Sequence, residues 1–165
     1  MMKNNTCSWL TSFCWVSIIA VMSGCSGVTD KITSWWSSPN SLKEIAVVAE
    51  PKANQNSATA LDIVFVYENE LVKQLPDTGP KWFQTRGQWQ QLYPQQFEWI
   101  SLQIPPGQQV KQVTLPARVG EAQYIVGFAN YLTEQGQYPV NLTPLTQVQI
   151  RLQADRIDVV DNAAN

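Results

Sequence analysis

The side chains that could carry out catalysis in this chain are its carboxylates, because the sequence contains no histidine. Without histidine, neither a Ser-His-Asp arrangement nor the usual zinc ligand sets can form. Glu68 and Glu70 are two residues apart and would point the same way in a strand, while Asp155, Asp158 and Asp161 cluster near the C-terminus. A glycoside hydrolase needs two such carboxylates beside a sugar-binding cleft. The alternative, which we favour, is that all five are solvated strand ends and turn residues, so we predict no catalytic residue and no metal ligand.

A cysteine supplies a second kind of chemistry, the acylation of a thiol. Residues 1–5 are polar with one positive charge at Lys3, and an apolar stretch follows from residue 9 to residue 22. This length suits the apolar region of a signal peptide and is too short for a transmembrane helix, which needs about 20 apolar residues. The stretch ends in Ser23-Gly24-Cys25. Two small residues directly before a cysteine resemble the lipobox of bacterial lipoproteins, in which a peptidase cleaves before the cysteine and the thiol is acylated.

The other cysteines favour the same interpretation. Cys7 and Cys14 lie inside residues 1–24, so the mature chain would keep Cys25 and no second thiol for a disulfide. The alternative is an ordinary secretory leader that happens to contain a cysteine. We predict a signal peptide over residues 1–24 and a membrane anchor on lipidated Cys25. In lipoprotein sorting, an aspartate after the cysteine would favour the inner membrane. Ser26 therefore indicates the outer membrane, with the domain facing the periplasm.

Composition narrows the remaining function classes. The chain is 44% hydrophobic and only 15% charged, with a net charge of −2 that becomes one unit more negative when Lys3 is removed with the leader. This content is typical of a globular domain. No stripe of lysine and arginine is present, so we expect no nucleic-acid partner. We also expect no cofactor and no small-molecule substrate.

The elements that must position these residues are short strands. Residues 25–41 are interpreted as a lipidated tether, in which Trp35 and Trp36 either sit at the lipid headgroups or pack on the domain. Residues 42–161 are predicted to form one all-β domain, and residues 162–165 a polar tail. Alternation and turn signals predict eight strands, at residues 45–49, 61–67, 97–104, 110–115, 124–131, 138–142, 148–152 and 156–160. An antiparallel two-sheet β-sandwich is the simplest architecture for such a set.

Two segments between the strands differ from the rest. Residues 81–92 have a helical spacing of apolar side chains, so we expect one short helical insertion that buries Trp82, Phe83 and Trp89 in the core. Residues 50–59 form a polar loop between the first two strands. This loop, at Asn54, Gln55, Asn56 and Ser57, is our candidate for contact with a protein partner. The alternative is a plain solvent-exposed connector, and under both interpretations we expect shortening residues 54–58 to leave stability nearly unchanged.

The order of these features resembles a known family, the TssJ outer-membrane lipoproteins of type VI secretion systems. The resemblance is carried by the lipobox, the asparagine-containing first loop, the strand and turn at residues 65–71, Trp82-Phe83 in the helical insertion, Pro106-Gly107, and the apolar strand at residues 125–131. The family's usual Asn-Pro-Asp of the first loop is replaced here by Asn54-Gln55-Asn56.

The resemblance implies a transthyretin-like β-sandwich in the periplasm. Its task would be to hold the periplasmic part of an inner-membrane secretion protein, TssM in that family, against the outer membrane. A pilotin- or chaperone-like lipoprotein of another envelope complex is the alternative. A hydrolase using Glu68 or Glu70 is a third hypothesis.

Overall fold

The computed structural model describes residues 38–164. The predicted signal peptide, Cys25, and the tryptophan pair Trp35-Trp36 lie outside the described residues, so these expectations stay predictions. The account below concerns the unit that begins at Ser38.

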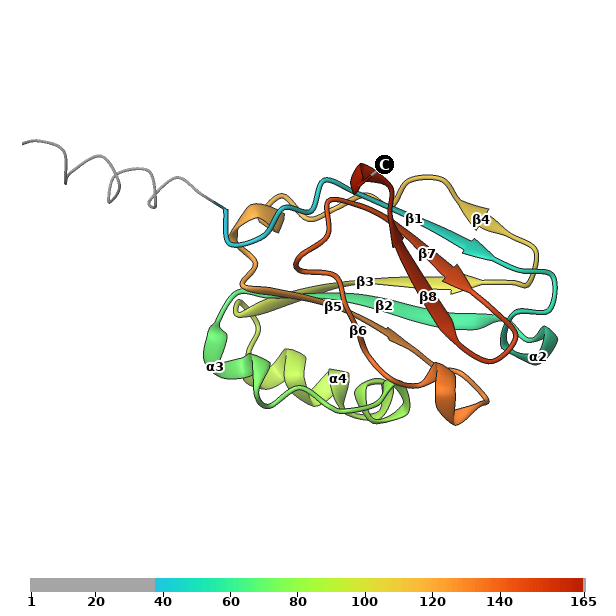
Figure 1. Ribbon diagram of the computed structural model, residues 1–165. Helices are drawn as coiled ribbons and strands as arrows, with labels where there is room; N and C mark the ends of the chain where they lie inside the picture. The colour runs from blue at the N-terminus through green and yellow to red at the C-terminus, as the bar shows by residue number, and fades with distance from the viewer. Residues whose placement is uncertain (1–37, 165) are drawn as a thin grey trace, which may run out of the picture. The chain divides into compact units, whose positions relative to one another are not determined.

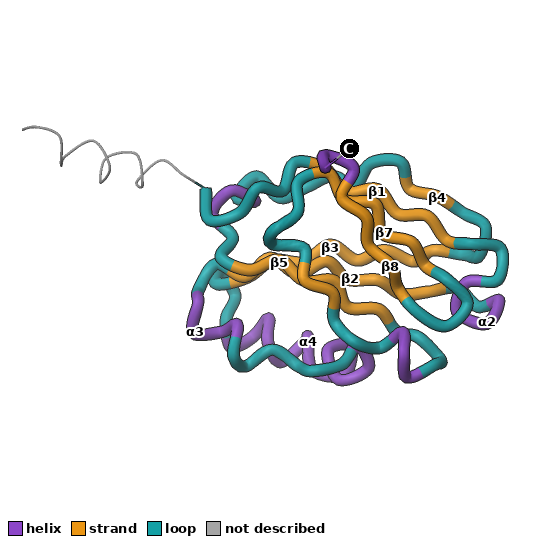
Figure 2. Tube along the Cα trace, in the orientation of Figure 1, coloured by secondary structure: helices purple, strands orange, loops and turns teal. Residues whose placement is uncertain are grey.

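Two four-stranded sheets lie face to face, and one longer helix covers the outer face of one of them (Figure 1). The first sheet has the order β4 (Gln109–Val110), β1 (Glu44–Ala49), β7 (Gln147–Leu152), β8 (Ile157–Asp161). The second has the order β3 (Phe97–Ile104), β2 (Thr59–Val66), β5 (Tyr124–Ala129), β6 (Val140–Asn141). The helices are α2 (Ala53–Asn56), α3 (Asn69–Val72) and α4 (Gly79–Leu92), with short 3₁₀ turns at Val119–Glu121, Glu134–Gly136 and Asn162–Ala164. Figure 2 shows how the loops gather at the two ends of this sandwich.

The predicted two-sheet β-sandwich with one helical insertion is confirmed, with differences in detail. One strand pair, β1 with β7, is parallel, and the other ladders are antiparallel. This pair can be parallel because β1 and β7 are not joined by a hairpin: the chain passes through the second sheet for β2 and β3, and again for β5 and β6, before it reaches β7. β4 and β6 have two residues each, shorter than predicted. Beyond β4 only an isolated bond continues beside β1, from the Val113 N–H to the Ile45 carbonyl at 2.8 Å, and Pro139 before β6 has no N–H to donate.

Strand β2 is buried on both faces. Leu61, Ile63 and Phe65 point toward the first sheet and form the core of the sandwich. Val64 and Val66 point the other way and pack beneath α4. A strand covered on both sides has no solvent face, which explains its nearly unbroken apolar sequence.

Helix α4 buries the face that its spacing predicts. Trp82 is fully buried and Trp89 is 9% exposed, while Phe83 is half-buried against the same cluster. The Trp82 ring stacks on Phe128 of β5 at 5.1 Å. The helix can lie this close because it starts at Gly79, where a Cβ atom would come within 1.9 Å of the Ala129 carbonyl oxygen. The prediction that this aromatic stripe belongs to the core is confirmed.

Candidate functional site

The loop between β1 and β2 contains a left-handed turn built without glycine. Asn54, Gln55 and Asn56 have φ angles of 48°, 54° and 64°. This region is uncommon for any residue with a Cβ atom, although asparagine enters it more readily than most. Three such residues in succession are held only where the surroundings fix them. The contacts of the turn show how this is done.

Asn54 anchors the turn to the rest of the domain. Its side chain is 2% exposed, and its Oδ1 accepts a hydrogen bond from the Leu132 N–H at 2.8 Å. Its Nδ2 donates to the Asn130 carbonyl at 3.3 Å. The backbone N–H of Asn54 donates to the Gln153 carbonyl at 2.9 Å. One residue thus joins the first loop, the segment after β5 and the turn between β7 and β8.

Tyr131 provides a second link between the segment after β5 and the turn between β7 and β8. Its hydroxyl lies 2.9 Å from the Gln153 carbonyl oxygen and 3.0 Å from the Arg156 carbonyl oxygen, and it can donate a hydrogen bond to either one. Burial raises the pKa of Tyr131 above its ordinary value, and the negative charge of Asp155 adds to this. Gly136 lies against the ring, since a Cβ there would come within 2.2 Å of it. The loops at this end form one fixed unit.

Three of the four residues predicted to contact a partner reach the surface. Gln55 and Asn56 are exposed and Ser57 is half-exposed, whereas Asn54 faces inward. An open hollow of about 570 Å³ lies beside them, lined by Pro51, Lys52, Gln55, Asn56 and Ala154. The turn therefore presents the side chains of Gln55 and Asn56 outward at the rim of a concave surface. It is not a plain solvent-exposed connector, and the expectation that shortening residues 54–58 leaves stability nearly unchanged is wrong, because Asn54 is a buried anchor.

The carboxylates singled out from the sequence do not form a catalytic pair. Glu68 and Glu70 are exposed and line neither of the hollows described here. Asp155 and Asp158 flank Arg156, with oxygens 3.9 and 3.5 Å from its guanidinium nitrogens. Backbone N–H groups, those of Gln147 and Thr146 first, hold the pKa of Asp161 below its ordinary value. Nothing in this geometry supports the hydrolase hypothesis.

Sequence reasoning missed Asp62, the one carboxylate that is buried within residues 38–164. Its side chain accepts hydrogen bonds from Trp82 Nε1 at 2.9 Å and from the Ser101 hydroxyl at 2.7 Å. Arg86 forms an ion pair with it at 2.6 Å. Asp62 is 1% exposed, and it fixes α4 to the outer face of its sheet. The signal was a single charge within an apolar strand, with an arginine one turn after a tryptophan in the following helix.

Residues 38–164 contain neither a metal-binding cluster nor a membrane-spanning helix. No group of three or more histidine, cysteine, aspartate and glutamate side chains there is placed to hold a metal ion. In the same residues, no helix has the length and apolar character needed to cross a bilayer.

Similarity to known proteins is found in the fold and not in the sequence. No family model and no curated protein matches the sequence. Among solved structures, the type VI secretion lipoprotein TssJ1 from Pseudomonas aeruginosa superposes with a TM-score of 0.55 at 17% identity, over 71% of this chain and 92% of that one. A chain of a type VI membrane complex gives 0.52 at 15% identity, over 73% and 98%. Lip from Serratia marcescens, a membrane-bound component of the type VI secretion system, gives 0.51 at 12% identity, over 73% and 96%. The chain has a TssJ-like fold.

The TssJ-like domain has two distinct ends. The described chain enters at one of them, where Asn40 is buried and its Nδ2 donates to the carbonyls of Val119 and Ala122. The left-handed turn at residues 54–56, which lies within α2 and is called the α2 turn below, is at the opposite end, before the start of β2 (Figure 1). The eight residues of β2 separate the two ends, a distance of roughly 23 Å at about 3.3 Å per residue.

Proposed function

We propose that this chain is a structural component of a type VI secretion membrane complex. In this proposal, lipidated Cys25 anchors it to the outer membrane and its domain in the periplasm holds an inner-membrane partner of the TssM kind. The role requires no catalysis. It requires an anchor, a rigid domain and a presented contact surface.

The observation that carries the proposal is the TssJ-like fold with a rigid loop unit at the end opposite the chain's entry. A domain attached through residues N-terminal to Ser38 would leave the α2 end free to meet a partner. The exposed Gln55 and Asn56 offer amide groups there, beside the hollow at Ala154. Because Asn54 fixes the turn from inside, these side chains need little ordering when a partner binds, and ordering of mobile side chains is a main cost of association.

The test replaces the exposed side chains without disturbing the turn. Glycine adopts positive φ freely, so the double variant Gln55→Gly/Asn56→Gly should fold with at least wild-type stability. We expect it to lose capture of the periplasmic region of the inner-membrane protein encoded beside this chain's gene. The matched control is Gln91→Ala, which removes an exposed side chain from α4. A folded double variant that captures the partner as well as wild type does would exclude the α2 turn as the contact.

The anchor is tested separately. In Cys25→Ser the acyl acceptor is lost, so we expect the folded protein to leave the outer-membrane fraction. A single acyl chain gives only marginal membrane binding, and stable anchoring takes more than one such signal. Continued fractionation of Cys25→Ser with the outer membrane would show that the anchor lies elsewhere.

A further inference from the structure

Strand β3 forms a free edge of the second sheet. It pairs with β2 along its whole length, and no strand of residues 38–164 lies on its other side. The Tyr67 N–H donates to the Gln96 carbonyl at 2.9 Å at the start of this ladder. Since hydrogen-bonded pairs alternate in an antiparallel ladder, the N–H and C=O groups of Trp99, Ser101 and Gln103 point away from β2. Within residues 38–164, no hydrogen bond engages these outward groups.

Apart from the charge of Glu98, this edge lacks the usual protection against pairing. Edge strands are commonly blunted by lysine, by proline, by a bulge or by a covering segment. The sequence of β3, FEWISLQI, contains no lysine or proline, and its register with β2 runs without a bulge. Ser101 and Gln103 are exposed. The middle and end of β3 are therefore open to another strand.

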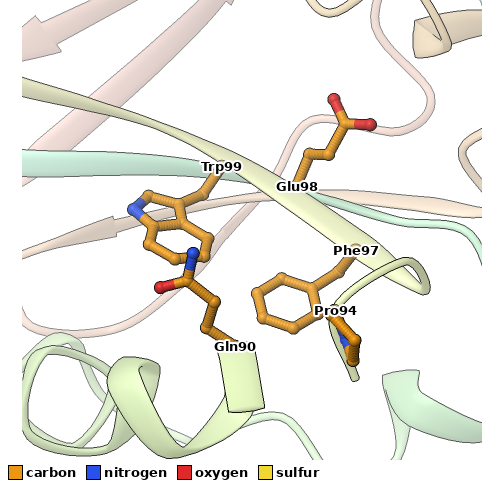
Figure 3. Close-up of a pocket in the computed structure, with 5 residues that line it drawn as sticks. All are labelled: Gln90, Pro94, Phe97, Glu98 and Trp99. Atoms are coloured by element: carbon orange, nitrogen blue, oxygen red, sulfur yellow. The ribbon is translucent and has the colours of Figure 1, made fainter. Parts of the chain in front are cut away.

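A hollow of about 310 Å³ lies beside this edge, lined by Gln90, Pro94, Phe97, Glu98 and Trp99. Figure 3 shows Phe97 and Trp99 on the side of β3 that faces α4, with Gln90 of α4 next to the Trp99 ring. Glu98 points to the other side of the strand. The two aromatic rings stack at 5.6 Å. The edge thus has a hollow with both polar and aromatic lining on one side, and the Glu98 carboxylate points to the other side.

We infer that the β3 edge binds an extended segment of another protein by strand addition. The backbone of the added strand would bond to Trp99, Ser101 and Gln103, as in other complexes of this mode. Its side chains alternate between the two faces. On the α4 side, an apolar side chain enters the hollow and packs against the Phe97 and Trp99 rings. On the other side a basic side chain meets Glu98, which has no ion pair within the described residues.

The same features argue against a second copy of this chain as the occupant. A second copy would bring Arg118 to this face together with both Glu98 and Glu121, with which Arg118 pairs, so it would add net negative charge there. Phe97 and Trp99, the aromatic side chains that β3 carries on the hollow's side, already pack in the cluster beneath α4. A segment with alternating apolar and basic residues supplies both the missing charge and the side chain for the hollow. This inference does not depend on the α2 turn.

The test uses the whole chain, purified in mild detergent, and a labelled eight-residue peptide of alternating valine and lysine. We expect the peptide to bind by fluorescence anisotropy and to slow amide exchange at residues 99–103. A peptide with glutamate in place of lysine should bind at least about tenfold more weakly, because it places like charges beside Glu98. Glu98→Gln should reduce this difference between the two peptides.

Two variants separate the backbone contact from side-chain effects. Gln103→Pro removes one outward N–H, and edge positions tolerate proline. It should weaken binding about fivefold, the effect of one hydrogen bond of about 1 kcal/mol. Gln103→Ala keeps the N–H and should bind as wild type does. If Gln103→Pro fails to fold, a peptide N-methylated at alternate residues tests the same contact on the wild-type protein.

Several results would overturn the inference. One is peptide binding that slows exchange elsewhere but not in β3. Another is equal binding of the lysine and glutamate peptides, or equal binding by Gln103→Pro and Gln103→Ala. Absence of binding at millimolar peptide would do the same. Dimerisation of the chain through β3 in sedimentation experiments, without peptide binding, would assign the edge to a second copy.

Discussion

Replacing Asn54 with alanine removes the side chain that fixes the α2 turn. The Leu132 N–H and the Asn130 carbonyl then lose their partner, which now lies at 2.8 and 3.3 Å from them. A buried polar group left without a partner costs about 1–3 kcal/mol. Both groups are partly buried, so we take about 1 kcal/mol for each. Alanine at a φ of 48° adds about 1 kcal/mol more, which gives a total near 3 kcal/mol.

Asn56 provides a matched control for this substitution. It is also an asparagine with positive φ, at 64°, but it is exposed and forms no side-chain hydrogen bond within the described residues. Asn56→Ala therefore reports the backbone cost alone, about 1 kcal/mol. The difference between the two variants, about 2 kcal/mol, measures the anchoring contacts of Asn54.

Chemical and thermal denaturation of the two variants give this difference. A domain of this size shifts its melting temperature by about 4 °C per kcal/mol, so Asn54→Ala should melt about 8 °C below Asn56→Ala. Asn54→Gly removes the backbone cost and should lie between them. If Asn54→Ala proves no less stable than Asn56→Ala, the hydrogen bonds of the Asn54 side chain contribute nothing to stability, and other contacts fix the turn.

The remaining predictions concern the core and the helix. Trp89→Ala should cost at least about 3 kcal/mol in urea denaturation because it truncates a buried aromatic; an unchanged midpoint would place the ring in solvent. Gly79→Ala should cost about 2–3 kcal/mol, since the new methyl meets the Ala129 carbonyl. Gly87→Ala, with nothing within 4 Å, should instead stabilise by about 0.5–1 kcal/mol; equal effects at both sites would contradict the close contact. Burial raises the pKa of Tyr67 to about 12, above its unfolded value near 10. The unfolded chain therefore loses this proton first, and stability falls between about pH 10 and 12. Tyr67→Phe should lose less stability over that window, and an unchanged pH dependence would contradict this.

Much of the fold could be predicted because the burial pattern repeats along the sequence. The alternation in β1 and the helical spacing of Trp82 and Trp89 each have a single geometric solution. The parallel pairing of β1 with β7 could not be predicted, because alternation gives the face of a side chain and not the neighbour of a strand. The short length of β4 and β6 could not be predicted for a similar reason. Whether a segment continues its ladder depends on the strand beside it.

The sequence could predict a polar loop between the first two strands, but not how that loop is held. A polar loop between strands suggests a connector, and nothing in composition separates Asn54 from Asn56. The difference arises from tertiary structure, because the Asn130 carbonyl and the Leu132 N–H that bind the Asn54 side chain lie more than 70 residues away in sequence. A local signal did exist in Asn54-Gln55-Asn56, since asparagine is the residue with a side chain that best tolerates positive φ. The burial of Asp62 could not be predicted for the same reason, since its hydrogen-bond and ion-pair partners come from α4 and β3.

The strain in the α2 turn bears on the proposed function. Gln55 is not a residue that favours a φ of 54°, so glycine at this position should raise the free energy of unfolding by about 1 kcal/mol. A turn that served only as a connector would have no reason to keep the less stable residue. A turn that forms a contact surface would keep glutamine at this position, because its side chain is then needed to bind the partner. The proposal therefore predicts opposite effects of Gln55→Gly, higher stability and weaker partner capture. A variant that gains stability and keeps full capture would show that the strain at Gln55 serves no recognition.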